Sequence, residues 1–281
     1  MEQINCLNFC DITSYLQSKQ GAEEILSLAM KEAGYETCER IYLGSSFCGK
    51  YFIQQSETNM KEWLQVCKEY QIKVTIVIPT FSEGDLEQGK KKVEQLLCLG
   101  DGIIDECTVN DYGMLFYLHQ NHKIAKNLGR LFMKDYRDIR YQEYFQIPWK
   151  LKMFTNHMTQ VLKECDVKGC EIDLTHKLID LSDVPEGVTV GIHAPYCYQT
   201  VGRICEFASI SKPIHQKFRA DDYCDEGCSN GMIQYHSQEE GIDYLRCGRT
   251  VYFKHLDYQL KGILKYRLIY FPIDMKANSK V

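Results

Sequence analysis

The sequence predicts an α/β protein whose 281 residues form a single (β/α)8 barrel. Short apolar runs alternate with amphipathic stretches along most of the chain, which is the pattern of βαβ units with parallel strands. Seven or eight such runs are present, and this number favours a closed barrel over the alternative, an open doubly wound sheet. The predicted fold class is therefore a TIM-type barrel.

The predicted strands are short apolar runs bounded by turn residues or helical stretches. In order they are residues 4–9, 40–44, 73–79, 102–109, 123–128, 169–174, 189–193 and 266–272. The third is the least ambiguous, because β-branched residues run through it and Pro79 stops it. We expect Lys73 to Ile78 to be buried on both faces of the strand.

The predicted helices fill intervals between these strands. They are residues 22–34, 60–70, 86–100, 112–120 and 153–165. In the first helix Ile25, Leu28, Ala29 and Ala33 share a face, and Gly34 ends the helix.

Residues 206–264 break the alternation. They are rich in Tyr, Gly and Asp and have no helical stripe. We expect one barrel domain over residues 1–281, with this Cys-containing segment as an appendage over one barrel mouth.

Composition limits the function classes. A net charge of -5 and a pI near 5.9 provide no overall basic field for DNA, although a local patch such as residues 217–219 stays open. The N-terminus has no charged and apolar signal segment, and no apolar stretch is long enough to span a membrane. We expect a cytoplasmic protein with no membrane span and no DNA partner.

The chain contains 14 cysteines, more than packing requires. In a reducing compartment this number favours metal ligation or redox chemistry over disulfides. Seven of the cysteines lie in apolar strand or helix patterns, where a free cysteine behaves as a small buried hydrophobe. These are Cys6, Cys10, Cys67, Cys98, Cys107, Cys165 and Cys170.

A separate group of cysteines has the spacing of a metal site. Cys224 and Cys228 form a Cys-x3-Cys pair, in which we expect Gly227 to allow the tight backbone turn, and Cys205 lies upstream. Such thiolates suit zinc or an iron–sulfur cluster. Three candidates remain for the fourth ligand: Cys48, Cys197 and Cys247.

Polar and ligand-type residues follow the predicted strands, where a barrel gathers its catalytic groups. They are Cys48, Thr80, Phe81, Asn110, Asp111, Arg130, Asp173 and His193. We expect His193, Asp111 and Asn110 to be catalytic.

Arg130 and Asp173 are the candidate substrate-binding residues among these strand-end positions. Simpler roles are open for several members of the group. Asn110 and Asp111 could cap the helix that begins near Tyr112, and His193 could be a hydrogen-bonded strand end. Arg130 and Lys134 are most simply solvated charges, and recruitment of an anionic substrate is the alternative.

Taken in order, these motifs resemble the peptidase U-32 (collagenase-like) family. His193, the "GRIC" turn and the "CDEGC" pair resemble its signature block. The stretches "IYLGSSFC" and "VIPTFSEGD…VNDYG" resemble the small, single-domain members that act in ubiquinone biosynthesis. The resemblance runs from about Ile41 to Gly231.

The resemblance implies a barrel with an oxygen-labile 4Fe-4S cluster held by Cys48, Cys205, Cys224 and Cys228. It implies oxygen-independent hydroxylation of a small aromatic quinone precursor or of an RNA base. Two departures exist: Cys197 is a fifth candidate thiolate, and the interval from Cys197 to Cys205 is one residue longer than usual. Zinc at the same cysteines is the alternative cofactor.

Two other functions compete with a hydroxylase. The chain could be a non-catalytic subunit in a hetero-oligomer with a larger family relative. A peptidase is disfavoured, because the sequence contains no Gly-x-Ser-x-Gly elbow and no His-Glu-x-x-His helix.

Overall fold

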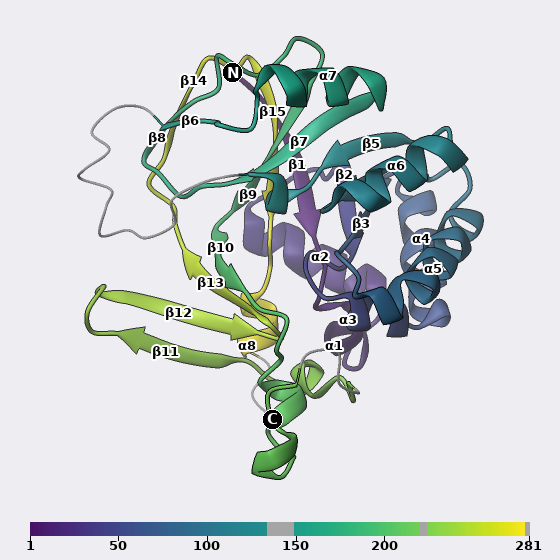
Figure 1. The fold of residues 1–281 in the computed structure, drawn as a ribbon, viewed down its shortest axis with the longest axis vertical. Coiled ribbons are helices and arrows are strands. Elements are labelled where there is room, and N and C mark those ends of the chain that lie inside the picture. The colour runs from purple at the N-terminus through teal and green to yellow at the C-terminus, as the bar shows by residue number, and fades with distance from the viewer. Residues whose placement is uncertain (134–148, 220–223, 279–281) are drawn as a thin grey trace.

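A computed structural model describes residues 1–133, 149–219 and 224–278, so Lys134 lies outside the described residues. Eight parallel strands close into a barrel in the order β1-β15-β9-β7-β5-β4-β3-β2 (Figure 1). They are β1 (Glu2–Asn8), β2 (Arg40–Gly44), β3 (Lys73–Ile78), β4 (Ile104–Val109), β5 (Ala125–Leu128), β7 (Val167–Asp173), β9 (Thr189–Ala194) and β15 (Lys265–Tyr270). The predicted (β/α)8 fold class is confirmed.

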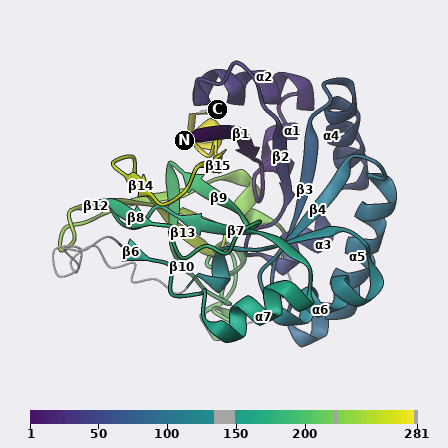
Figure 2. The same ribbon diagram turned by 90° about the horizontal axis from the view of Figure 1, so that it is seen from above.

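The helices lie outside the barrel. They are α1 (Thr13–Gln17), α2 (Ala22–Ala33), α3 (Gly49–Gln54), α4 (Glu57–Glu69), α5 (Leu86–Leu99), α6 (Tyr112–Asn121), α7 (Asn156–Glu164) and α8 (Asp274–Asn278). Gly34 ends α2 in the left-handed conformation (φ 69°), and the side chain of Ser56 accepts a hydrogen bond at the start of α4. Figure 2 shows the longer helices gathered around one side of the barrel.

Two small sheets cover the side that lacks helices. The first pairs β14 (Gln259–Lys261), β8 (Leu178–Asp180) and β6 (Trp149–Lys150). The second is antiparallel and pairs β10 (Tyr196–Val201), β13 (Thr250–Lys254), β12 (Ile242–Cys247) and β11 (Ile233–Ser237). Within the described ranges, β8 alone connects β7 to β9, and β10 to β14 connect β9 to β15.

The antiparallel sheet forms most of the appendage, and its boundary differs from the predicted residues 206–264. Tyr196 pairs with Lys254 in this sheet, so the appendage begins with β10 rather than after Cys205. At its other end, β14 pairs with β8 in the three-stranded sheet and not with the antiparallel one. The sequence does not reveal this boundary, because β10 directly follows β9 and has the pattern of a continuation of that strand.

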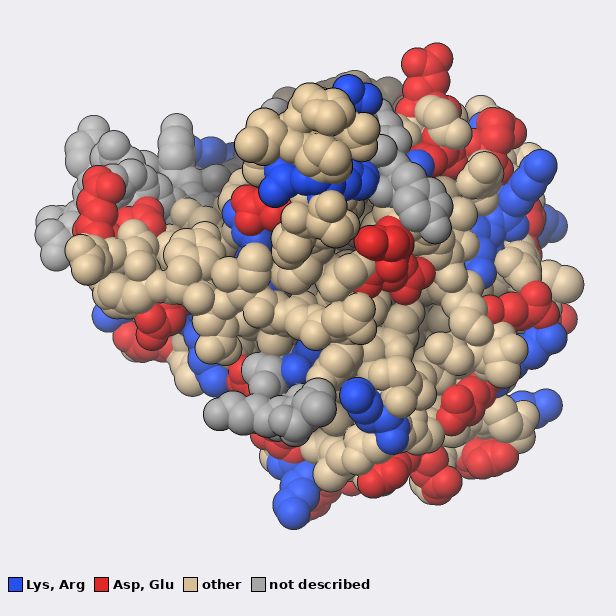
Figure 3. All heavy atoms as spheres, turned by 90° about the horizontal axis from the view of Figure 1, so that it is seen from below, with Lys and Arg blue, Asp and Glu red and all other residues tan. Residues whose placement is uncertain are grey.

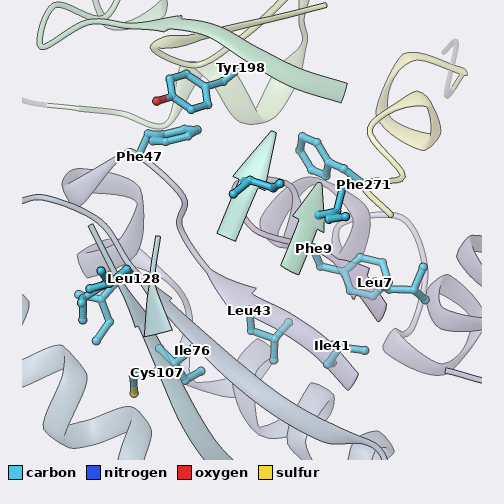
Figure 4. Close-up of a cluster of buried hydrophobic side chains, with 14 of the residues drawn as sticks. Leu7, Phe9, Ile41, Leu43, Phe47, Ile76, Cys107, Leu128, Tyr198 and Phe271 are labelled. Carbon is cyan, nitrogen blue, oxygen red and sulfur yellow. The ribbon is translucent and has the colours of Figure 1, made fainter. Parts of the chain in front are cut away.

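The outward faces of the barrel strands pack against the helices. Leu7, Ile41, Leu43 and Ile76 belong to this outer core (Figure 4). The β3 burial pattern leaves only Lys73 exposed, which confirms that the strand is buried on both faces. On α2 the predicted face is wrong at Leu28, which is 39% exposed.

Most of the cysteines expected to be small core residues are buried. Six of the seven are buried, and Cys98 is exposed. The prediction is therefore wrong at Cys98 alone, which lies near the end of α5.

Candidate functional site

A cavity lies where the barrel strands end and the appendage begins. The barrel side contributes Asp11, Cys48, Thr80 and Phe81. The appendage side contributes Cys205, Cys224, Cys228 and Cys247. The cavity therefore brings together the four cysteines that the resemblance implies as ligands, together with a fifth.

Cys48 is held by the turn that follows β2. Its backbone N–H donates to Ser45 Oγ at 2.9 Å, and the Ser45 hydroxyl in turn donates to the carboxylate of Asp11. The backbone N–H of Ser46 donates to the second oxygen of that carboxylate at 3.0 Å. Asp11 thus fixes the turn from which Cys48 enters the cavity.

The Cys-x3-Cys loop turns at a different residue from the one expected. The left-handed residue is Glu226 (φ 55°), whereas Gly227 begins the 3-10 helix Gly227–Asn230 outside that region. The backbone N–H of Glu226 donates to Cys224 Sγ at 3.4 Å. The expectation for Gly227 is therefore wrong, because its neighbour Glu226 makes the turn.

The loop is also joined to the barrel. Gln54, at the end of the helix that Cys48 begins, donates from Nε2 to the carbonyl oxygen of Cys224 at 2.9 Å. On the appendage side, Ser209 Oγ donates to the carbonyl oxygen of Cys205 at 3.1 Å. These bonds position the backbone at two cysteines without using either sulfur.

Two candidates for the remaining ligand position lie in different surroundings. Cys247 ends β12 and accepts a hydrogen bond from the buried ammonium of Lys276 at 3.6 Å. The same ammonium donates to the carbonyl oxygen of Cys228. Cys197 is fully buried in β10, donates from Sγ to the carbonyl oxygen of Leu174 at 2.9 Å, and does not line the cavity.

Burial governs the ionisation of these thiols. It raises the pKa of Cys48 to about 12, and it also raises the pKa values of Cys224, Cys228 and Cys247. The positive charge of Arg249 acts in the opposite direction on Cys48. These four cysteines are therefore neutral thiols by themselves, and a bound metal would be needed to hold them as thiolates.

The donor set suits a soft metal, because thiolates prefer zinc and iron–sulfur clusters. Within the parts of the chain that the structure describes, no three His, Cys, Asp or Glu side chains stand close enough together to hold a single ion.

His193 lies inside the barrel rather than in this cavity. Its Nε2 is 2.8 Å from the Glu171 carboxylate, which also accepts a bond from Thr108 Oγ1. Burial lowers the pKa of His193, with a further contribution from Arg130. Neutral His193 therefore donates from Nε2 to Glu171, while Nδ1 has no hydrogen-bond partner among the described residues. A catalytic role for His193 stays a prediction.

Arg130 and Asp173 form a buried ion pair. Arg130 Nη1 is 3.1 Å from Asp173 Oδ1, and Arg130 is only 2% exposed. Its guanidinium also lies 4.8 Å from the ring centroid of Phe47. The ring centroids of Phe47 and Tyr198 are 4.6 Å apart (Figure 4). The expectation that Arg130 is a solvated charge is wrong, and its substrate-binding role stays a prediction.

Asn110 and Asp111 lie in another hollow, beside α6 and α7. Asn110 donates to the carbonyl oxygens of Ser46 and Ile78 at 3.1 and 3.2 Å. Asp111 accepts a hydrogen bond from the backbone N–H of Met114 at 2.8 Å, which confirms that it caps α6. These contacts are structural, and a catalytic role for either residue stays a prediction.

Sequence reasoning missed a charged layer deeper in the barrel. Both guanidinium nitrogens of Arg267 contact the Glu106 carboxylate, at 2.5 and 3.0 Å, and Arg40 lies 3.5 Å from it. A signal existed at Glu106 and Arg267, because each lies inside a strand among apolar residues. Asp11 was also missed, although it follows the first strand just as the other candidates follow theirs.

Comparison with known proteins gives little information about function. No protein-family model and no curated protein matches the chain. The protein TT1561 of Thermus thermophilus shares 8% identity over 61% of this chain and 80% of that one, with a TM-score of 0.30. A glycoside hydrolase family 18 N-acetylglucosaminidase from Paenibacillus barengoltzii shares 10% identity over 90% and 88%, with a TM-score of 0.28. Neither likeness supports a functional argument.

The part of the chain that the structure describes contains no helix that could cross a membrane. None of its helices combines the length and the apolar character that such a span requires.

Proposed function

We propose that this chain is an iron–sulfur protein of the peptidase U-32 kind, with a 4Fe-4S cluster held by Cys48, Cys205, Cys224 and Cys228. One observation supports this assignment above the others: these cysteines come from a barrel strand end and from a distant appendage, yet they line one cavity. Cys48 is favoured over Cys197, because Cys197 Sγ is committed to a backbone carbonyl outside the cavity.

A cluster and zinc place different demands on these cysteines. Zinc would require all its sulfur ligands at about 2.3 Å from one centre. A 4Fe-4S cluster instead spreads its ligands over separate iron atoms. The resemblance of the cysteine motifs supports the cluster, and zinc is the alternative.

The proposed activity is oxygen-independent hydroxylation of a small aromatic quinone precursor or an RNA base. The cluster would supply electron transfer. The hydroxyl oxygen must come from a donor other than dioxygen. A larger family relative is the proposed partner in a hetero-oligomer, and recovery of that relative with the protein from its native host would test the pairing.

Charges around the cavity fit a negatively charged substrate. Arg249 lines it and has no carboxylate partner within the described ranges. Lys50, by contrast, is paired with Asp85 at 2.6 Å. Both an aromatic acid and an RNA phosphate would supply the missing negative charge.

The test is anaerobic purification of the wild type, Cys48→Ser and Cys197→Ser, followed by assays of iron, sulfide and visible absorption. We expect iron and sulfide in equal amounts in the wild type and in Cys197→Ser, and loss of both in Cys48→Ser. One zinc without sulfide in the wild type would overturn the proposal. Iron retained in Cys48→Ser but lost in Cys197→Ser would show that the fourth ligand is wrong.

A further inference from the structure

The chain between β10 and β11 forms a protruding loop with exposed apolar side chains. We call residues 203–219 the rim loop, because Arg203, Ser209 and Arg219 line the cysteine cavity. In Figure 1 this part of the chain is green and projects below the barrel. Its exposed apolar residues are Ile204 (42%), Ile210 (63%), Ile214 (89%) and Phe218 (57%).

The rim loop is held in shape by its own hydrogen bonds. Ser209 Oγ donates to the carbonyl oxygen of Cys205 at 3.1 Å and accepts from the backbone N–H of Phe218 at 3.1 Å. The backbone N–H of Lys217 donates to the carbonyl oxygen of Ile214 at 3.2 Å. These bonds hold Ile214 and Phe218 in place, so their exposure does not arise from an unfolded segment.

The rim loop is basic, although the whole chain has a net charge of -5. Its cationic residues are Arg203, Lys212, Lys217 and Arg219. Its one acidic residue, Glu206, is paired with Arg246 at 3.0 Å. Asp221 and Asp222 follow in the sequence but lie outside the described residues. The loop thus combines outward apolar groups with positive charge.

We propose that the rim loop docks on an anionic phospholipid surface, with Ile214 and Phe218 entering the interface and the basic residues contacting headgroups. Apolar side chains that project from a loop ringed by Lys and Arg are suited to the boundary between acyl chains and negative headgroups. None of the four apolar residues lines the cysteine cavity, so that cavity does not account for their exposure.

A lipid surface fits these features better than a protein partner or RNA. Protein interfaces are enriched in aromatic residues and Arg around a packed centre, whereas three of the four apolar groups here are isoleucines on a protruding loop. RNA would use the basic residues and leave the isoleucines exposed. Because the remaining chain is acidic, the rim loop would also orient the cavity toward the membrane. Figure 3 views the protein from this side.

The test measures binding of the purified protein to vesicles of phosphatidylcholine alone or mixed with phosphatidylglycerol. We expect sedimentation with the mixed vesicles, little with phosphatidylcholine, and weakening by about tenfold in Ile214→Ser/Phe218→Ser. The matched control is Leu256→Ser/Leu264→Ser, at residues that are 66% and 86% exposed elsewhere, and it should bind like the wild type.

A second experiment measures insertion of the rim loop into the lipid. Trp63 and Trp149 are buried, so a tryptophan introduced as Ile214→Trp should be the one quenched by brominated lipid. Absence of wild-type binding to the mixed vesicles would overturn the proposal, as would equal binding by Ile214→Ser/Phe218→Ser. Binding to RNA without binding to vesicles would overturn it in favour of a nucleic-acid surface. The docking does not depend on the cluster, and iron content measured on the same samples separates failure of the two proposals.

Discussion

Gln54 donates its side-chain N–H to the carbonyl oxygen of Cys224 at 2.9 Å, and this bond joins the helix that follows Cys48 to the Cys-x3-Cys loop. The two ends of the bond lie far apart in the sequence. It connects the barrel half of the proposed cluster site to the appendage half.

Loss of this bond should loosen the site without unfolding the protein. We expect Gln54→Ala to lower the free energy of unfolding by about 1 kcal/mol at most and to release iron to a chelator faster than the wild type under anaerobic conditions. The control is Gln65→Ala, which removes a bond to Glu69 within α4. Equal iron release by both variants would show that Gln54 does not support the site.

A carboxylate inside the barrel should abolish folding. Val77 is 3% exposed and packs with Cys6, Tyr42 and Ile269. Val77→Asp buries an uncompensated charge at a cost of at least several kcal/mol, comparable to the whole stability of a domain. We expect no soluble protein from this variant, and normal yield from Leu28→Asp on the exposed part of α2. Recovery of folded Val77→Asp would contradict the burial of β3.

The buried pair of Arg130 and Asp173 should be structurally important. Arg130→Met leaves the Asp173 carboxylate buried without its cation, which we expect to lower the free energy of unfolding by about 3–5 kcal/mol. Arg130→Met/Asp173→Leu should recover much of this loss in urea denaturation.

An exposed ion pair provides the matched control for the buried pair. Lys150→Met breaks the ion pair with Asp183, whose side chains are 54% and 52% exposed, and should change stability by less than about 1 kcal/mol. An Arg130→Met protein as stable as the wild type but unable to bind substrate would instead support the substrate-binding role predicted from the sequence.

His193 should make stability decrease in mild acid. Burial lowers its pKa in the folded state, so the unfolded chain, with a His pKa of about 6.5, binds the proton first as pH falls. Its contribution is therefore present above about pH 6.5 and lost below it, by up to about 1.4 kcal/mol per pH unit.

Denaturation of the wild type and His193→Gln at about pH 7.5 and about pH 5.5 measures this effect. We expect His193→Gln, which keeps an N–H donor for Glu171, to lose less of its free energy of unfolding at the lower pH than the wild type does. The control His119→Gln, on the exposed face of α6, should lose as much as the wild type. The same loss in all three proteins would mean that other groups cause the pH dependence.

Local patterns in the sequence predicted most of the fold. The β-branched run Lys73–Ile78 predicted a buried central strand, and the structure has β3 at those residues. Gly34 predicted the end of α2 because a left-handed residue favours glycine there. The appendage boundary was missed because the pairing of Tyr196 with Lys254 joins residues far apart in sequence, and no local period records such a pair.

The sequence by itself determined the eight-stranded barrel and identified the cysteines worth testing, because strand periodicity and residue type are local properties. Tertiary structure decided which side chains meet. It placed Cys247 in the lining of the cavity and Cys197 outside it, and it paired Arg130 with Asp173. The physical reason is that barrel closure and the turn after β9 decide which of these side chains lie close together. Both depend on contacts between segments that are distant in the sequence, and the order of residues does not reveal such contacts.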